Sequence, residues 1–588
     1  MTYRPPVRDM AYTLNEVAGL SGLLGSGSFE ELSADLVSSV MEEGAKLAAD
    51  VLAPLNRSGD AEGAKLGEKG VSVPAGFADA YKKWVEGGWG SIAATPDFGG
   101  QGLPVALSVA MQEMWNAACM SFGLCPILSQ GAIEALTAHG TPEQKKRYLP
   151  KLISGEWTGT MNLTEPQAGS DLNALKAKAV PQGDGTYRIT GTKIFITYGD
   201  HDMTDNIVHL VLARLPDAPA GTKGISLFLV PKFLVNEDGS LGERNDAYCI
   251  GIEEKLGIHG SPTCTMSYGE NGGAIGWLIG EENRGLACMF TMMNNARLLV
   301  GTQGVAIAEA AYQHALAYAK ERKQGRPAGS DLAPGEMALI IEHPDIRRTL
   351  YTMKSMTAAA RAICYATAVA IDGAEVAATE EERRAAQARA DLLTPIAKSF
   401  STDIGVEAAS LGVQIHGGMG FIEETGAAQF LRDARILPIY EGTNGIQAID
   451  LVSRKLPLGN GDVVRSFIGE MRQTAREARS SNDEVRTRIG TALDDALDTL
   501  DKATDYMLAH LKSAPNDCLA GATPYLRLFG TAAGGHFLAR AAADGVSPSR
   551  RAIAQFYASN VLPGVHGLLG PATAGGESLY TLSADDLG

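Results

Sequence analysis

Met161–Asp171 reads MNLTEPQAGSD, and this stretch stands where the periodicity of the chain changes. Before it, apolar residues recur at three- and four-residue spacing, as in Ala106–Met120 (ALSVAMQEMWNAACM), which predicts amphipathic helices. After it come short β-branched segments separated by Gly, Pro and Asp, which predict strands. The stretch itself is shaped by Pro and Gly, so we expect a loop that presents Thr164, Ser170 and free backbone N–H groups.

The segments on either side of this loop predict an α+β protein. Helix starts are expected at Ser28, where Glu31 completes a capping box, and at Thr141, where Pro142 takes the first helical position. Helical periodicity returns at residues 285–322 and continues to about 456. The expected strands are residues 186–197, 206–215, 224–230 and 247–252.

These patterns divide the chain into an N-terminal extension, a helical domain, a β-rich domain, a second helical domain and an additional helical domain. The expected ranges are 1–35, 36–157, 158–283, 284–456 and 462–588. A Pro-Leu-Gly-Asn-Gly segment at 457–461 is typical of a linker. We interpret the last domain, with helices expected near 462–480, 483–513, 524–544 and 549–562, as a bundle that covers the core. A subunit-interface or membrane-surface domain is the alternative.

The composition limits the classes of protein. The chain has 588 residues, a net charge of −17, 45% hydrophobic and 20% charged residues, as in folded globular proteins. The acidic balance argues against nucleic-acid binding, which needs clustered Lys and Arg. Seven cysteines, none in a CxxC pair, indicate a reducing compartment, so we expect a cytoplasmic protein. We find neither a secretory signal nor an apolar run of the ~18 residues that a transmembrane helix needs.

Three further segments stand out. They are Lys193–Gly199 (KIFITYG), Gln414–Phe421 (QIHGGMGF) and Arg432–Gly445 (RDARILPIYEGTNG). The first predicts a strand ending in aromatic and hydroxyl side chains, and the second a glycine-dense loop that a ligand can approach closely. The signatures of a Rossmann site, a P-loop, a zinc protease and a serine hydrolase are absent, and the histidines lack metal-ligand spacing. We therefore expect no metal site.

Together these segments resemble the acyl-CoA dehydrogenase family. Its motifs TEPxAGSD, QxxGGxGF and YEGT stand here in the family's order, and the resemblance covers about residues 40–455. The lead-in and the domain after 460 resemble the family's longer branch, and within it the subfamily that oxidises 3-methylmercaptopropionyl-CoA in dimethylsulfoniopropionate breakdown. The resemblance implies a β-barrel-like central domain, a C-terminal four-helix bundle and non-covalent FAD. It also implies oxidation of an acyl-CoA to the 2-enoyl-CoA.

The resemblance assigns the catalytic base to Glu441. This carboxylate would remove the α-proton while the β-hydrogen leaves as hydride, and its backbone N–H would hold the thioester carbonyl. Burial in an apolar pocket raises the pKa of a carboxyl group and makes it a stronger base at neutral pH. Some relatives carry the base just before the arginine that matches Arg297, but here that residue is Ala296.

The resemblance also implies binding residues. Phe195 stands where the family has a tryptophan beside the flavin, and Arg322 matches an arginine that reaches the FAD pyrophosphate of a neighbouring subunit. The full set expected to bind FAD is Met161, Thr164, Ser170, Phe195, Thr197, Arg322, Gln324, Gln414, Gly417, Gly418 and Thr443. The set expected to bind acyl-CoA is Ser170, Asn294, Arg297 and Gly442.

The implied partners are an acyl-CoA, electron-transfer flavoprotein as electron acceptor, and a second copy of the chain, because Arg322 and Gln414–Gly418 match contacts made across a subunit boundary. We expect at least a dimer. A fatty acyl-CoA dehydrogenase of β-oxidation and an acyl-CoA oxidase are the enzymatic alternatives. A catalytically inactive scaffold that binds flavin or nucleic acid is the non-enzymatic alternative, and both Glu441 and the net charge of −17 argue against it.

Overall fold

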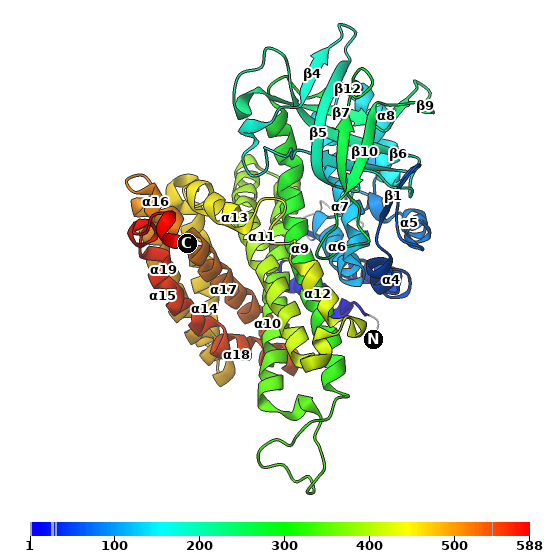
Figure 1. Cartoon of the computed structure of the whole chain (residues 1–588). Helices are drawn as coiled ribbons and strands as arrows, with labels where there is room; N and C mark the ends of the chain where they lie inside the picture. Colours follow the sequence, from blue (N-terminus) through cyan, green and yellow to red (C-terminus); the bar gives the residue numbers. More distant parts are fainter. Residues whose placement is uncertain (1–2, 25–28, 30–31, 544) are drawn as a thin grey trace. The chain divides into compact units, whose positions relative to one another are not determined.

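The computed structural model describes residues 3–24, 29, 32–543 and 545–588. The chain forms two compact units (Figure 1). The first comprises chiefly residues 43–296, and the second comprises residues 6–42 together with 297–588. Among the described residues, no helix is both long and apolar enough to cross a membrane.

Helices form the N-terminal part of the chain, of which residues 6–42 belong to the second unit and the rest to the first. The predicted helix start at Ser28 and Glu31 lies outside the described residues, and the helix that follows begins after Ser33, whose hydroxyl accepts the Leu36 N–H (3.1 Å). The predicted start at Thr141 is confirmed as a capping box with Gln144. The early helices are α1 (Val7–Tyr12), α2 (Leu20–Leu24), α3 (Ala34–Lys46), α4 (Leu55–Glu62), α5 (Phe77–Glu86), α6 (Val105–Ala118), α7 (Met120–His139) and α8 (Pro142–Ser154).

An eight-stranded sheet completes the first unit, with the order β10-β11-β5-β12-β7-β6-β3 and with β4 beside β5 and β6. Its strands are β3 (Trp157–Asn162), β4 (Lys178–Pro181), β5 (Tyr187–Thr197), β6 (Asn206–Arg214), β7 (Ile225–Pro231), β10 (Ala247–Ile252), β11 (Thr263–Tyr268) and β12 (Ala274–Ile279). Two small hairpins lie outside it, β1 (Lys65–Gly67) with β2 (Gly70–Ser72) and β8 (Phe233–Val235) with β9 (Leu241–Arg244).

The strand pairing closes on itself. Strand β4 runs antiparallel to β5 and meets β6 in a parallel bridge between Lys178 and Arg214. The circuit β5-β12-β7-β6-β4 is therefore complete, and the β-barrel-like domain is confirmed. The four predicted strands correspond to β5, β6, β7 and β10, whereas β3, β4, β11 and β12 of the same sheet were not predicted.

One prediction is wrong at the start of this domain. Met161 and Asn162 belong to β3 and not to a loop, and they pair with Leu210 and Val211 of β6. All six residues of β3 are buried. A strand buried on both faces lacks the polar–apolar alternation by which strands are recognised, so its sequence did not predict it.

Long helices build the second unit. They are α9 (Gly285–Ala319), which enters this unit at Arg297, α10 (Pro344–Val376) and α11 (Glu380–His416), followed by the shorter α12 (Ala427–Ala434) and α13 (Asn444–Asp450). Gln414 lies in the last turn of α11 and not in a loop, because the helix continues to His416 and is capped by Gly417, whose φ is 60°. Glycine adopts this left-handed conformation without steric cost.

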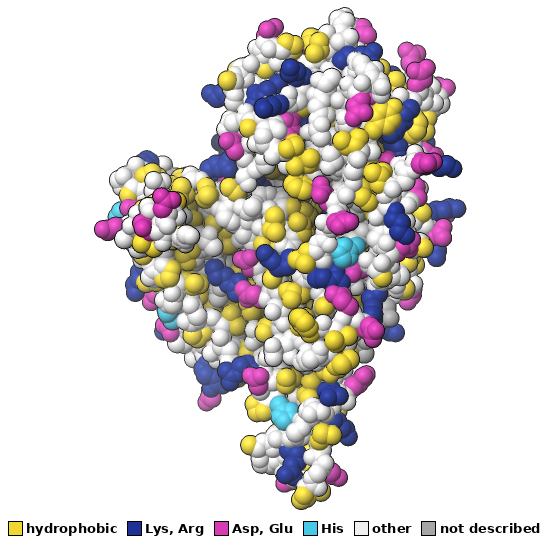
Figure 2. All heavy atoms as spheres, viewed as in Figure 1, with side chains coloured by type: hydrophobic (Ala, Val, Ile, Leu, Met, Phe, Trp, Pro, Cys, Tyr) yellow, Lys and Arg dark blue, Asp and Glu magenta, His cyan; other side chains and the backbone are white. Residues whose placement is uncertain are grey.

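The additional helical domain packs on α10, α11 and α13 through α17 and α18. Its helices are α14 (Asp462–Arg479), α15 (Glu484–His510), α16 (Pro515–Ala520), α17 (Ala522–Ala541), α18 (Pro548–Asn560) and α19 (His566–Thr573). The predicted linker at 457–461 is a tight turn in which Gly459, Asn460 and Gly461 all have positive φ. On the face seen in Figure 2, basic and acidic side chains are interspersed.

Candidate active site

Glu441 lies in the loop between α12 and α13, and its backbone is left-handed, with φ of 54°. A non-glycine residue in this conformation costs ~1–3 kcal/mol and persists only where its surroundings hold it. The side-chain amide of Gln447 donates to the carbonyls of Glu441 (3.2 Å) and Gly442 (3.3 Å). The hydroxyl of Thr443 caps α13 by accepting the Ile446 N–H (3.3 Å). The helix that follows the loop therefore holds it in its strained conformation.

The Glu441 side chain is half-buried. Burial raises its pKa, and the nearby charges of Arg297 and Lys398 act in the opposite direction. Within the described part of the chain, no group donates a hydrogen bond to this carboxylate, and none accepts one from the Glu441 N–H. A desolvated carboxylate with a raised pKa and no hydrogen-bond donor is suited to accept a proton at neutral pH.

Lys398 on α11 is a completely buried lysine. Its Nζ donates to the side-chain oxygen of Asn444 (2.8 Å), the first residue of α13. Burial lowers the pKa of Lys398 to about 7, although the carboxylates of Glu441 and Asp403 oppose that shift. Lys398 thus links α11 to α13, the helix that follows Glu441.

Arg297 on α9 is also buried, and its guanidinium lies 3.7 Å from a carboxylate oxygen of Asp450 on α13. Asp450 in turn pairs with Arg454 (2.5 Å). Burial lowers the pKa of Arg297, while the charges of Asp450 and Glu441 raise it. Arg297 therefore places a positive charge beside the loop, whereas Asn294 is exposed on the same helix. The assignment of Asn294, Arg297 and Gly442 to acyl-CoA binding stays a prediction.

Several residues of this site were not predicted from the sequence. They are Lys398, Asn444, Gln447 and the pair formed by Tyr440 and Gln303, in which the tyrosine hydroxyl donates to the amide oxygen. A lone lysine within the apolar run Pro395–Phe400 (PIAKSF) was the available signal, because lysine is almost never fully buried unless it is paired.

In the first unit, the predicted loop after β3 is fixed by a buried ion pair. Lys193 of β5 lies 2.8 Å from Glu165, and it also donates to the Leu163 carbonyl (3.0 Å). The Glu165 carboxylate also accepts the Ala177 N–H (3.0 Å) at the oxygen that pairs with Lys193, and the Lys176 N–H (2.7 Å) at its other oxygen. Thr164 is thereby held between two anchored residues.

Phe195 has unusual geometry. Its φ is 59° and its side chain is 58% exposed, although it belongs to β5. The register with β11 shifts here, because Lys193 and Ile196 pair with Met266 and Cys264, which leaves an extra residue in β5. The neighbouring Ile194 N–H donates to the Thr164 carbonyl (3.0 Å), so the bulge and the predicted loop lie side by side.

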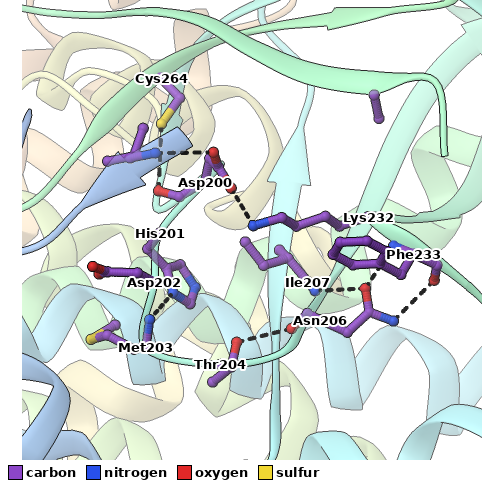
Figure 3. Close-up of polar contacts among 12 residues, drawn as sticks. Asp200, His201, Asp202, Met203, Thr204, Asn206, Ile207, Lys232, Phe233 and Cys264 are labelled. Carbon is purple, nitrogen blue, oxygen red and sulfur yellow. Dashed lines mark hydrogen bonds and ion pairs between the residues drawn. The ribbon is translucent and has the colours of Figure 1, made fainter. Parts of the chain in front are cut away.

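The segment that follows β5 is fixed by polar contacts with other parts of the same unit (Figure 3). The Asp200 carboxylate accepts hydrogen bonds from the Lys232 ammonium group (2.6 Å) and from the Val71 N–H (3.2 Å). His201 accepts the Met203 N–H (3.2 Å), and its other ring nitrogen lies 2.8 Å from the Thr158 hydroxyl. Thr197, which pairs with Thr263 of β11, is therefore followed by a fixed turn.

The remaining predicted residues lie at separate places. Met161 is buried within β3, and Ser170 is exposed on the loop that follows. Arg322 and Gln324 are exposed after α9, and the Gln324 carbonyl lies 2.8 Å from the His343 ring. The predicted residues at the end of α11 are also exposed; they are Gln414, Gly417 and Gly418. The cofactor-binding roles of all these residues stay predictions.

Family comparisons match almost the whole chain. Residues 40–156, 160–270 and 283–456 match the N-terminal, middle and C-terminal domains of acyl-CoA dehydrogenases. Residues 467–583 match a domain described as "Acetyl-CoA dehydrogenase C-terminal like". The additional helical domain is thus a known module of such proteins.

Full-length relatives agree with these matches. The 3-methylmercaptopropionyl-CoA dehydrogenase of Ruegeria pomeroyi is 49% identical over 91% of this chain and 90% of its own length. A butyryl-CoA dehydrogenase of Syntrophomonas wolfei is 35% identical over 96% of both chains. The crystal structure of a Bacillus anthracis acyl-CoA dehydrogenase complexed with FAD shares the fold, with a TM-score of 0.75 and 20% identity over 95% of this chain and 90% of that one. The chain belongs to the acyl-CoA dehydrogenase family.

Proposed function

We propose that this protein is an FAD-dependent acyl-CoA dehydrogenase in which Glu441 is the catalytic base. The observation that carries the proposal is Glu441 itself, a strained, half-buried carboxylate with a raised pKa and no hydrogen-bond donor among the described residues. Strain and a raised pKa at one carboxylate are typical of an acid–base residue.

The residues of the β-domain fit a flavin ring. Phe195 exposes more than half of an aromatic side chain in a conformation that costs free energy, which is unfavourable unless a planar group covers the ring. Thr164, Thr197 and Phe195 would hold the isoalloxazine. The exposed Arg322, with the Gln414–Gly418 segment, would bind the FAD of a partner subunit. Bound FAD would supply the two-electron acceptor for the β-hydrogen.

The chemistry of the chain's own residues follows from the loop geometry. The Glu441 carboxylate would take the α-proton of the thioester. The free Glu441 N–H would donate to the thioester carbonyl, where negative charge develops as the proton leaves. Arg297 and Lys398 would stabilise the ionised carboxylate before the reaction.

We propose 3-methylmercaptopropionyl-CoA as the substrate, supported by the relative with 49% identity over nine-tenths of both chains. Butyryl-CoA is the second candidate, supported by the relative with 35% identity. The test is a panel of acyl-CoA thioesters mixed anaerobically with FAD-loaded protein, with bleaching of the oxidised flavin as readout. Faster flavin reduction by butyryl-CoA than by 3-methylmercaptopropionyl-CoA would reject 3-methylmercaptopropionyl-CoA as the substrate. If no thioester reduced the flavin, the proposed acyl-CoA dehydrogenase activity would be rejected.

The proposed electron acceptor is electron-transfer flavoprotein, and the proposed assembly is at least a dimer. The alternative acceptor is oxygen, as in acyl-CoA oxidases. Reoxidation of the product-bound reduced enzyme in air should be slow for a dehydrogenase and fast for an oxidase. The dimer is supported by apolar side chains exposed next to Gln414–Gly418, namely Met419, Phe421 and Ile422. A cytoplasmic location stays a prediction.

A further inference from the structure

The additional helical domain packs against the two helices that hold the loop of Glu441, the proposed base. Helix α17 contacts both α11 and α13, the helices that hold this loop. At Gly530, α17 approaches α11 so closely that a Cβ atom there would lie 2.6 Å from the ring of Phe400. The contact is therefore tight enough to fix α17 relative to α11.

Arg527 of α17 makes the polar part of this contact. Its guanidinium donates two hydrogen bonds to Glu407 of α11, of 2.7 and 2.9 Å, and lies 5.3 Å from the centre of the Phe400 ring. Such two-pronged pairs fix orientation as well as distance. Glu407 lies one helical turn after Asp403. Burial raises the pKa of Asp403, and the Asn444 hydrogen bond and the Arg527 charge oppose that shift.

Asp403 of α11 forms a hydrogen bond with α13, the helix that follows Glu441. Its carboxylate accepts a hydrogen bond from the side-chain amide of Asn444 (2.7 Å). The same amide donates to the Thr402 hydroxyl (3.0 Å), and its oxygen accepts from Lys398. Asn444 begins α13, three residues after Glu441, so its orientation sets the position of that loop.

We propose that Arg527 is a positioning residue for Glu441, acting through Asp403 and Asn444, and that the additional helical domain thereby orients the base. This inference rests on the proposed function. The groups that face Asp403 are Lys398 and Glu407 on its own helix, Asn444 on α13 and Arg527 on α17. Without Arg527, Asp403 takes up a proton at higher pH and its hydrogen bond to Asn444 weakens.

The test compares Arg527→Met with Arg465→Met in the FAD-loaded protein. Arg465 of α14 pairs with the exposed Asp505 of α15 (2.9 Å) in the same domain, and it is not among the groups that shift the pKa of Asp403. Arg527→Met should slow flavin reduction by ~10-fold at pH 8 and by more at pH 6, because small displacements of a reacting group cost large factors in rate. FAD content and affinity for a non-oxidisable acyl-CoA analogue should change less than ~2-fold, since the binding residues remain. Arg465→Met should match wild type.

Two further variants keep the inference falsifiable if Arg527→Met folds poorly. Arg527→Lys keeps the charge without the paired hydrogen bonds and should recover part of the rate. Asp403→Asn should slow reduction equally at both pH values. Wild-type rates in these variants, or equal losses in Arg465→Met, would overturn the inference. A wild-type protein that no acyl-CoA reduces would instead reject the proposed function.

Discussion

The Nζ of Lys193 lies 2.8 Å from a carboxylate oxygen of Glu165, and both side chains are almost completely removed from solvent. Burial lowers the pKa of Lys193 to about 8, while the Glu165 carboxylate favours its charged form. The pair joins the loop of Thr164 to the strand of Phe195, the two elements proposed to hold the flavin. The pair therefore holds this loop and this strand together.

Glu165→Gln should destabilise this domain, because it leaves a buried ammonium group without its counter-charge. Breaking a buried pair in this way costs ~3–5 kcal/mol. We expect an earlier denaturation midpoint and a protein that loses FAD on gel filtration. The double variant Glu165→Leu with Lys193→Met removes both charges and should be more stable than the single variant. A Glu165→Gln protein with unchanged midpoint and FAD content would contradict this role.

Much of the fold could be predicted from the sequence because helical periodicity and strand composition are local. The loops that carry Glu441 and Thr164 could also be predicted, because Gly and Pro residues mark them. The positive φ of Phe195 could not be predicted, because that conformation is ordinarily a glycine property. The ion partner of Lys193, 28 residues away, likewise depends on packing that no local pattern encodes.

Glu441→Gln should abolish flavin reduction and leave FAD binding largely intact. The substitution keeps the size of the side chain and the backbone N–H, and removes only the oxygen that accepts the proton. Loss of a general base costs ~10²–10⁴-fold in rate, and Ala296 offers no second carboxylate. Anaerobic titration with acyl-CoA measures the effect. Near-normal bleaching of the flavin would show that Glu441 is not the base.

Lys398→Met should move the pH dependence of flavin reduction. Glu441 must be ionised to act, so the rate rises as pH passes its pKa, which the Lys398 charge lowers. Removing that charge raises the pKa and shifts the rise to higher pH. We expect ~10-fold slower reduction at pH 7, with partial recovery at pH 9. The exposed Lys512→Met is the control. An unshifted profile in Lys398→Met would exclude this coupling.

The protein should sediment and scatter light as at least a dimer of its 61.8 kDa chain. Phe421 is 88% exposed beside the Gln414–Gly418 segment, and such an exposed apolar side chain is typical of an interface. Phe421→Asp should weaken self-association and increase FAD loss together. The exposed Leu579→Asp is a matched apolar control near the C-terminus. A stable monomer that retains FAD would contradict the dimer.

His536 should make the additional helical domain sensitive to acid. Its ring is completely buried beside Phe467 and Phe537, and neither ring nitrogen has a hydrogen-bond partner among the described residues. Burial lowers its pKa to about 3, although Glu470 opposes the shift. Because the folded-state pKa lies below the ordinary value, the unfolded chain binds the proton more readily. Stability is therefore lost as pH falls from about 6.5 towards 3.

The titration of His536 should lower the free energy of unfolding by ~2 kcal/mol at pH 5 relative to pH 8. His536→Leu removes the titrating ring from an apolar site, so its denaturation midpoint should fall less than that of wild type between these pH values. The surface variant His510→Gln should follow wild type. Urea denaturation monitored by circular dichroism at pH 5 and 8 provides the measurement. If the midpoints of His536→Leu and wild type fall equally, the acid sensitivity has another origin, because His536 then binds its proton at a similar pH in the folded and unfolded chains.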